Sequence, residues 1–242
     1  MVRRMSIATP SILSETEMVA GFEDLEPREI IERAFDVFQE RLCVVSSFGA
    51  ESVVLLHLLA EVKPDVPVIF LNTGKLFGET LRYRDRLQQV LGLTDIRSIA
   101  PSAHDLYQSD QDGDLWSRDT DSCCHLRKVL PQARAIAPFE ALITGRKRFQ
   151  TRERESLKAL EMHADGKFRV NPLAKWSLDD IRAHIESHDL PRHPLVKDGY
   201  LSIGCMPCTS RVQEGENYRS GRWAGQDKDE CGIHLNVDGD GI

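Results

Sequence analysis

The hydrophobic residues of the chain gather in short runs that alternate with longer segments of helical periodicity. The short runs, which predict buried strands, span residues 41–48, 67–73, 95–99 and 141–144. Residues 52–62 and 79–91 lie between them and predict helices with one hydrophobic face. This alternation predicts an α/β fold, a mostly parallel sheet with helices on both faces.

The pattern also divides the chain into regions. Ser177 and Asp180 have the spacing of a helix N-cap and its N3 partner. Beyond residue 191 the alternation fades into a glycine-rich, loop-rich tail. We expect a mobile N-terminal arm over 1–20, because Arg3 and Arg4 are followed by no hydrophobic signal segment. A ligand-binding α/β domain over 21–208 and a C-terminal tail over 209–242 would follow.

Composition narrows the choice of ligand. The formal net charge of −7 argues against general nucleic-acid binding, which needs a basic surface. Basic residues nevertheless cluster locally, at 146–148, 152–154 and 211–222, which favours a small anionic ligand. No stretch has the length of a membrane span, so we expect a cytoplasmic protein without structural disulfides.

Three polar loops follow predicted strands at their carboxyl ends, where open parallel sheets bind ligands. They are SSFGAES at 46–52, LNTGKLFGET at 71–80 and TGRKRFQ at 144–150. The first also forms the start of a predicted helix, whose free amides favour an anion. A single loop of this kind is more often a simple cap, but three on one sheet edge predict a nucleotide site.

The cysteines carry the most specific signal. Cys123 and Cys124 are adjacent, and Cys205 and Cys208 form a CxxC pair. Four such thiols could bind zinc or an iron–sulfur cluster, and the spacing alone leaves both open. Neighbouring side chains on a helix diverge by about 100°, so the adjacent pair predicts a distorted or terminal helical turn. Cys43, within a hydrophobic run, is predicted to be a buried strand residue.

Cys231 stands apart, in the segment ECGIH near the C-terminus. Lys228 and His234 flank it, and a neighbouring cation lowers the pKa of a thiol and so favours the reactive thiolate. A glycine-rich polar tail gives this thiol little core to pack into, so we interpret Cys231 as a nucleophile.

Together the SFGAES, LNTGKLFGET and GRKRFQ segments, both cysteine pairs and the terminal ECGIHL resemble the assimilatory adenylylsulfate reductases. These are a branch of the phosphoadenylylsulfate/adenylylsulfate reductase family, and the similarity runs from about residue 41 to 235. The family usually carries aspartate where this chain has Asn72. The resemblance implies a nucleotide-binding fold like that of the adenine nucleotide hydrolases and ATP pyrophosphatases.

The resemblance also implies roles. The four paired cysteines would hold one 4Fe-4S cluster, and Cys231 would attack the sulfur of adenylylsulfate. The resulting S-sulfocysteine would be reduced by thioredoxin or a similar dithiol protein to release sulfite, in sulfate assimilation towards cysteine. Lys128, four residues after Cys124, would lie between cluster and substrate, and His234 would lie at the phosphosulfate with Arg219 and Arg222. The implied substrate-binding residues are Ser46, Ser52, Leu71, Thr73, Gly145, Arg154, Arg219 and Arg222.

Three other functions remain open at this point. A phosphoadenylylsulfate reductase would use the same nucleophile but generally lacks the cluster cysteines. An ATP-pyrophosphatase-type adenylating enzyme would carry an SGGxDS-like loop, which this chain lacks. A zinc-binding interaction module would leave the Cys231 tail without a purpose. We expect no nucleic-acid or membrane partner, and the sequence is compatible with a homo-oligomer.

Overall fold

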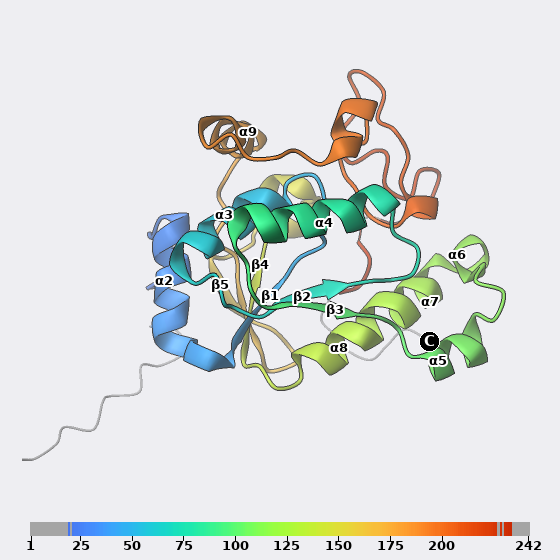
Figure 1. Cartoon of the computed structure of the whole chain (residues 1–242), viewed down its shortest axis with the longest axis horizontal. Helices are drawn as coiled ribbons and strands as arrows, with labels where there is room; N and C mark the ends of the chain where they lie inside the picture. Colours follow the sequence, from blue (N-terminus) through green and yellow to red (C-terminus); the bar gives the residue numbers. More distant parts are fainter. Residues whose placement is uncertain (1–18, 20, 227, 229, 234–242) are drawn as a thin grey trace, which may run out of the picture.

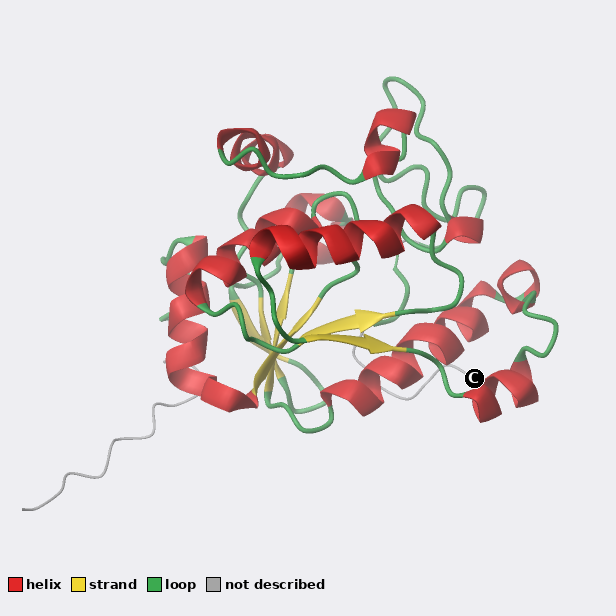
Figure 2. Cartoon of the chain, viewed as in Figure 1, coloured by secondary structure: helices red, strands yellow, loops and turns green. Residues whose placement is uncertain are grey.

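The fold is a single twisted sheet between two layers of helices (Figure 2). The computed structural model describes residues 19, 21–226, 228 and 230–233. The strand order is β3-β2-β1-β4-β6-β5, and neighbours are parallel except for the antiparallel pair β5 and β6. The strands are β1 (Leu42–Val45), β2 (Val68–Leu71), β3 (Ile96–Ile99), β4 (Ala141–Thr144), β5 (Leu160–Met162) and β6 (Phe168–Val170).

Strand β1 lies in the middle of the sheet, and its four residues are all buried. Val44 pairs with Val68 of β2 on one side and with Ile143 of β4 on the other. Val44 belongs to the larger core cluster on one face, whereas Cys43 belongs to the smaller cluster on the opposite face. This burial on both faces is typical of a parallel sheet. It confirms the prediction that Cys43 is a buried strand residue.

Helices cover both faces, as predicted. In Figure 1, α2, α3, α4 and α9 lie on one side of the sheet, and α5, α7 and α8 lie on the other. The bounds are α2 (Pro27–Phe38), α3 (Ser52–Val62), α4 (Gly78–Leu91), α5 (Ala103–Ser109), α6 (Leu115–Arg118), α7 (Thr120–Cys124), α8 (Leu130–Ile136) and α9 (Leu178–Ser187).

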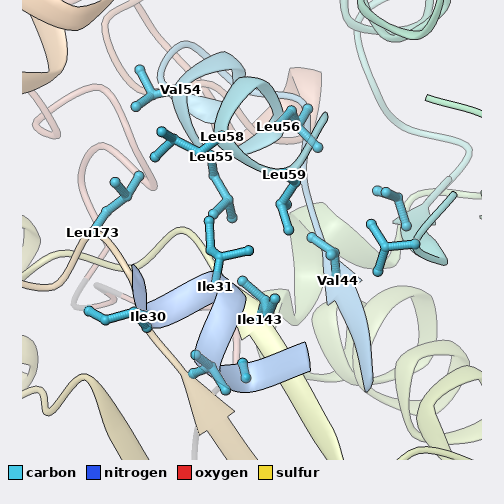
Figure 3. Packing of buried hydrophobic residues seen from close by; sticks show 14 of the residues in the cluster. Ile30, Ile31, Val44, Val54, Leu55, Leu56, Leu58, Leu59, Ile143 and Leu173 are labelled. Carbon is cyan, nitrogen blue, oxygen red and sulfur yellow. The ribbon is translucent and has the colours of Figure 1, made fainter. Parts of the chain in front are cut away.

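The larger core forms where α3 packs on the sheet. Leu55 and Leu59 of α3 lie above Ile31 of α2, with Val44 and Ile143 of the central strands below (Figure 3). Helix α3 is hydrophobic around most of its surface because it is covered by α2, α4 and α9 as well as by the sheet. This packing fixes the N-terminus of α3, and therefore the loop between β1 and α3.

The predicted elements agree closely with the structure. Helix 52–62 has the predicted bounds, and α4 begins one residue earlier than predicted. The N-cap of α9 is confirmed, since the amide of Asp180 donates to Ser177 Oγ at 3.1 Å. The pattern did not predict α2, α5–α8 or the hairpin of β5 and β6.

The two ends of the chain also bear on the predicted boundaries. The arm predicted over 1–20 falls outside the described residues except for Val19, which packs against the core. From residue 191 to 233, the described part of the chain contains only two short 3-10 helices, η5 (Pro194–Asp198) and η6 (Met206–Cys208). The loop-rich tail is therefore confirmed. In the part of the chain that the structure describes, no helix is long and apolar enough to cross a membrane.

Candidate functional site

A pocket opens where the direction of the chain through the sheet reverses. From β1 the chain proceeds to β2 and β3 on one side, and it then returns to β4 on the other side of β1. Loops diverge at such a switch point and leave a crevice at the carboxyl ends of the strands. The predicted site residues that line the pocket are Ser46, Ser52, Leu71, Thr73, Lys128, Gly145, Arg154, Cys205, Arg219, Arg222 and Cys231.

The loop after β1 is tightly folded. The amide of Phe48 lies 3.3 Å from Ser46 Oγ, and the amide of Gly49 donates to Ser52 Oγ at 3.0 Å. Phe48 adopts a positive φ of 50°, which its fully buried ring stabilises by packing edge-on against Phe70. Both predicted serines therefore shape the loop from within while facing the pocket.

The loop after β2 connects the pocket to the cysteines. Thr73 is buried, and its Oγ1 lies 3.2 Å from Cys205 Sγ. Asn72 Oδ1 accepts from the amide of Gly74, which has a φ of 69°. Because an aspartate could accept the same hydrogen bond, Asn72 preserves the turn despite its departure from the family pattern.

Basic side chains from the loop after β4 reach the pocket already paired with carboxylates. Buried Lys147 contacts Glu51 at 2.6 Å, and Arg154 contacts Glu230 at 2.6 Å. Burial lowers the pKa of Lys147, and the charge of Glu51 only partly offsets this effect. The pocket therefore holds cations in a poorly hydrated setting, where an incoming anion interacts strongly.

Arg222 is the pocket cation whose surroundings most clearly favour the binding of a ligand. Its guanidinium lies 4.2 Å from the ring centroid of Trp223, and burial lowers its pKa, with the Cys231 thiolate as the strongest opposing influence. Arg222 Nε and Trp223 Nε1 are buried donors without a hydrogen-bond partner among the described residues. Unpaired buried donors are costly, so they favour an acceptor-rich ligand.

The adjacent cysteines lie at a change of helix type. Helix α7 ends at Cys124, and a π-helical turn, η2 (His125–Val129), joins it to α8. A π-turn holds an extra residue, which alters the direction of side chains around it. The predicted helical distortion is thereby confirmed. Cys205 lies in the loop-rich region after residue 191, and its backbone forms an isolated antiparallel bridge with Leu76.

The four thiols influence one another. Burial raises the pKa of Cys123 above its ordinary value, and neighbouring Cys205 and Cys208 raise it further. Burial also raises the pKa of Cys124, to about 11, and Cys205 adds to this shift. Burial likewise raises the pKa of Cys208. A metal cation bound by this donor set would stabilise the thiolates.

The spacing of the thiols bears on which metal group they fit. Tetrahedral zinc would hold its sulfur ligands about 3.8 Å apart. Within the described part of the chain, the only group of three or more potential ligands lying mutually within 4.8 Å is His57, His184 and His188. No three cysteine sulfurs among the described residues therefore lie mutually within 4.8 Å, so the thiols are not drawn together as closely as around a bound zinc ion.

The histidine group lies between α3 and α9, apart from the pocket. His57 Nδ1 lies 3.2 Å from His184 Nε2, and the rings of His184 and His188 stack at 4.2 Å. Stacked rings cannot both direct an in-plane nitrogen lone pair at one ion. Burial lowers the pKa of His184 to about 4 and also lowers the pKa of His57, so these two side chains pack as neutral imidazoles. We interpret it as packing and not as a metal site.

Lys128 lies beside Cys124, as their four-residue spacing on a helix predicts, and lines the same pocket as Cys231. Its Nζ is 3.8 Å from Cys124 Sγ and 5.8 Å from the ring centroid of Trp223. Burial opposes its charge, but the thiolates of Cys231, Cys205 and Cys124 outweigh this effect and raise its pKa. Lys128 is thus the cation that the cluster cysteines and the candidate nucleophile share.

The tail brings Cys231 to the pocket. Cys231 is half-buried, and the carbonyl of Ile233 accepts from Gln132 Nε2 at 2.8 Å. Gly221 makes the preceding turn possible, since a Cβ there would lie 2.2 Å from the carbonyl oxygen of Ser210. His234, the third residue predicted to be catalytic, lies outside the described residues.

Sequence reasoning missed the residue that joins the cysteine helix to the sheet. Arg127 donates through two nitrogens to Asp110, at 2.5 and 3.0 Å, and through a third to the carbonyl of Thr73 at 2.9 Å. Burial would raise the pKa of Asp110, but the hydrogen bonds and charge of Arg127 lower it overall. No local pattern signals this pair, because its partners are seventeen residues apart in an irregular region.

Fold and pocket together define a class of protein, an α/β fold of the nucleotide-binding type with thiols beside a pocket lined by cations. Residues 41–211 match the model of the phosphoadenosine phosphosulfate reductase domain, and the chain belongs to this family. It is 53% identical over 218 residues to the adenosine 5'-phosphosulfate reductase of Mesorhizobium japonicum, covering 90% of this chain and 85% of that relative.

Solved structures agree. The phosphoadenylyl-sulfate reductase of Candida auris, in a phosphate complex, superposes with a TM-score of 0.70 at 26% identity, covering 83% of this chain and 98% of that one. The FMN adenylyltransferase of Candida glabrata, with FAD and pyrophosphate, has a TM-score of 0.56 at 14% identity, covering 88% and 73% of the two chains. This second likeness concerns the fold alone. The predicted fold class and family are confirmed.

We predict that Arg127→Met lowers the free energy of unfolding by about 3–5 kcal/mol, because it leaves the buried carboxylate of Asp110 uncompensated. Arg134→Met is the matched control, since its partner Asp105 lies at the surface and the pair should contribute about 1 kcal/mol or less. Urea unfolding followed by circular dichroism measures both. If both variants lost the same free energy of unfolding, the buried pair would contribute no more stability than the exposed one.

Proposed function

We propose that the chain reduces adenylylsulfate to sulfite and AMP, with thioredoxin or a similar dithiol protein as electron donor, in assimilatory sulfate reduction. The observation that carries the proposal is the meeting of Cys231, Lys128 and Arg222 in a pocket at the switch point of the sheet. A nucleophile and two cations around one cavity suit attack by a thiolate on an anionic sulfur centre.

In the proposed reaction the Cys231 thiolate attacks the sulfur of the sulfate group, and the bond from that sulfur to the phosphate oxygen breaks. AMP leaves with the bonding electron pair, and S-sulfocysteine remains. A thiolate of the dithiol protein then attacks the Cys231 sulfur and releases sulfite, and the second thiol resolves the mixed disulfide. The dithiol supplies both electrons, and such dithiols stay reduced in the cytoplasm, where we place the reaction.

The pocket residues would fall into groups that bind different parts of the substrate. Ser46, Ser52, Leu71, Thr73 and Gly145 lie in or beside the loops at the carboxyl ends of the strands and would hold the nucleotide together with Arg154. Arg219 and Arg222 would bind the phosphosulfate, and Lys128 and His234 would offset charge at the sulfur. In this division, residues 21–208 bind nucleotide and cluster, and 209–242 carry the nucleophile.

The four paired cysteines are proposed to hold a 4Fe-4S cluster. Their number and the burial of three of them fit the group, and four thiolates are its usual ligands. When bound, the cluster would place a negatively charged assembly beside Lys128. The ammonium of Lys128 would then lie between that charge and the substrate's sulfate group, and hold the sulfate in place for Cys231.

A phosphoadenylylsulfate reductase is the second candidate, since the Candida auris structure carries that name. The four-cysteine pattern and the name of the Mesorhizobium relative favour the unphosphorylated nucleotide. We predict a higher kcat/KM for adenylylsulfate than for its 3′-phosphorylated form when sulfite release is measured with both. A clear preference for the phosphorylated form would assign the chain to the second function.

We predict that serine at Cys123, Cys124, Cys205 or Cys208 abolishes the cluster and nearly all activity, because each thiolate supplies one of four ligands. Iron and sulfide content and visible absorption of protein purified without oxygen measure the cluster. Cys43→Ser is the control, since Cys43 lies in the core of the sheet away from these thiols. Full iron content and normal turnover in one of the four variants would remove that cysteine from the ligand set.

The sharpest prediction concerns the nucleophile. Cys231→Ser should retain cluster and AMP binding but reduce turnover to background, because a serine hydroxyl is scarcely ionised near neutral pH. Wild-type protein given adenylylsulfate without thioredoxin should gain one sulfite-sized mass adduct on the Cys231 peptide. Reduced thioredoxin should remove it. An adduct on a different cysteine, or multiple turnovers in the serine variant, is incompatible with the proposed mechanism.

A further inference from the structure

The segment that carries Cys231 is anchored by polar contacts on both sides of the thiol. On one side, both carboxylate oxygens of Glu230 lie close to Arg154 Nη2, at 2.6 and 2.7 Å. On the other, the carbonyl of Ile233 accepts from Gln132 at 2.8 Å. Glu230 immediately precedes Cys231 in the chain, so the ion pair acts directly beside the thiol.

The ion pair is well shielded from water. The side chains of Arg154 and Glu230 are 11% and 13% exposed, and Thr151 Oγ1 lies 3.4 Å from the same carboxylate. A shielded charged pair with additional hydrogen bonds holds its geometry more firmly than an exposed one. Gln150 contacts the other terminal nitrogen of Arg154, which restricts the rotation of the guanidinium.

The backbone of the tail would not fix this position without such contacts. Residues 230–233, around the thiol, contain no helix and no strand, whereas the backbone of 221–226 is tied to the preceding loop by an isolated bridge between Arg222 and Thr209. Gly225 and Gly232 have φ values of 81° and 84°, a region that glycine enters at little cost. Side-chain anchors are therefore the means by which the thiol is held at the pocket.

We propose that Glu230 is a positioning residue, whose ion pair with Arg154 holds the Cys231 thiol at the distance and angle needed for attack. This inference rests on the proposed function, in which Arg154 also binds the nucleotide. One guanidinium then contacts both the bound nucleotide and the residue next to the nucleophile. Because misplacement by about 1 Å can reduce a reaction rate on the order of 100-fold, loss of this anchor should act on the chemical step.

The test compares Glu230→Gln with Glu214→Gln in the cluster-loaded full chain. Glu214 is an exposed tail carboxylate outside the pocket, so its variant removes the same charge without touching the anchor. Quenched-flow mass spectrometry at saturating adenylylsulfate, without thioredoxin, gives the rate of adduct formation on Cys231. Calorimetry gives the dissociation constant of AMP, and hydrogen exchange gives the protection of the Cys231 peptide.

For Glu230→Gln we expect adduct formation to slow on the order of 10-fold to 100-fold, AMP affinity within about 3-fold of wild type, and faster exchange in the Cys231 peptide. Glu214→Gln should match wild type in all three. If Glu230→Gln forms adduct at the wild-type rate, or loses AMP affinity by the same factor as its rate, Glu230 does not position the thiol. Tighter AMP binding at an unchanged rate would instead make Glu230 a competitor of the nucleotide, and would overturn the inference.

Failure of the underlying function gives a different result. If wild-type protein forms no adduct on Cys231, the proposed reaction is wrong, whatever Glu230 does. If wild type and Glu214→Gln form the adduct and only the Glu230 comparison fails, the reaction stands without this anchor.

Discussion

The central constraint on this molecule is that a parallel strand must be covered on both faces and paired on both edges. Strand β1 satisfies both requirements, because β2 and β4 pair with its two edges and a separate core cluster covers each of its faces. Its carboxyl end therefore cannot continue into another layer and must turn out of the sheet at the pocket. The loops after β2 and β4 leave the sheet at the same edge, so the placement of the site follows from the burial of one strand.

The basic side chains at this edge of the sheet contact two kinds of partner. Lys147 and Arg154 each have a carboxylate, whereas Lys128 and Arg222 lie near thiols and the ring of Trp223. Desolvated cations interact with an anion more strongly than exposed ones do. An acidic chain can therefore offer a site to an anionic ligand, because several of its cations gather in one pocket.

The sequence predicted the strands of the sheet centre and the pocket loops because each carries a local signal, a hydrophobic run followed by polar and glycine residues. It also predicted the turn distortion at Cys124, since adjacent ligands demand one. Helix α2 was missed although Pro27 stands at its first turn and the amide of Glu26 donates to Glu29, a signal that capping rules describe. The pairs Arg127 with Asp110 and Arg154 with Glu230 could not be predicted, because they depend on how distant segments pack.

The π-helical turn at His125–Val129 has a consequence for how this region tolerates change. Deleting one residue there would restore regular α-helical hydrogen bonding, which is the more stable local arrangement. The same deletion would rotate everything before it by about 100° relative to α8, and so turn Cys123 and Cys124 away from the tail. A shorter segment would therefore favour local helix stability, whereas the present length keeps Cys123 and Cys124 turned towards the tail. A shortened chain could fold more firmly here and still lose its thiol site, so thermal stability is a poor guide to function for variants of this helix.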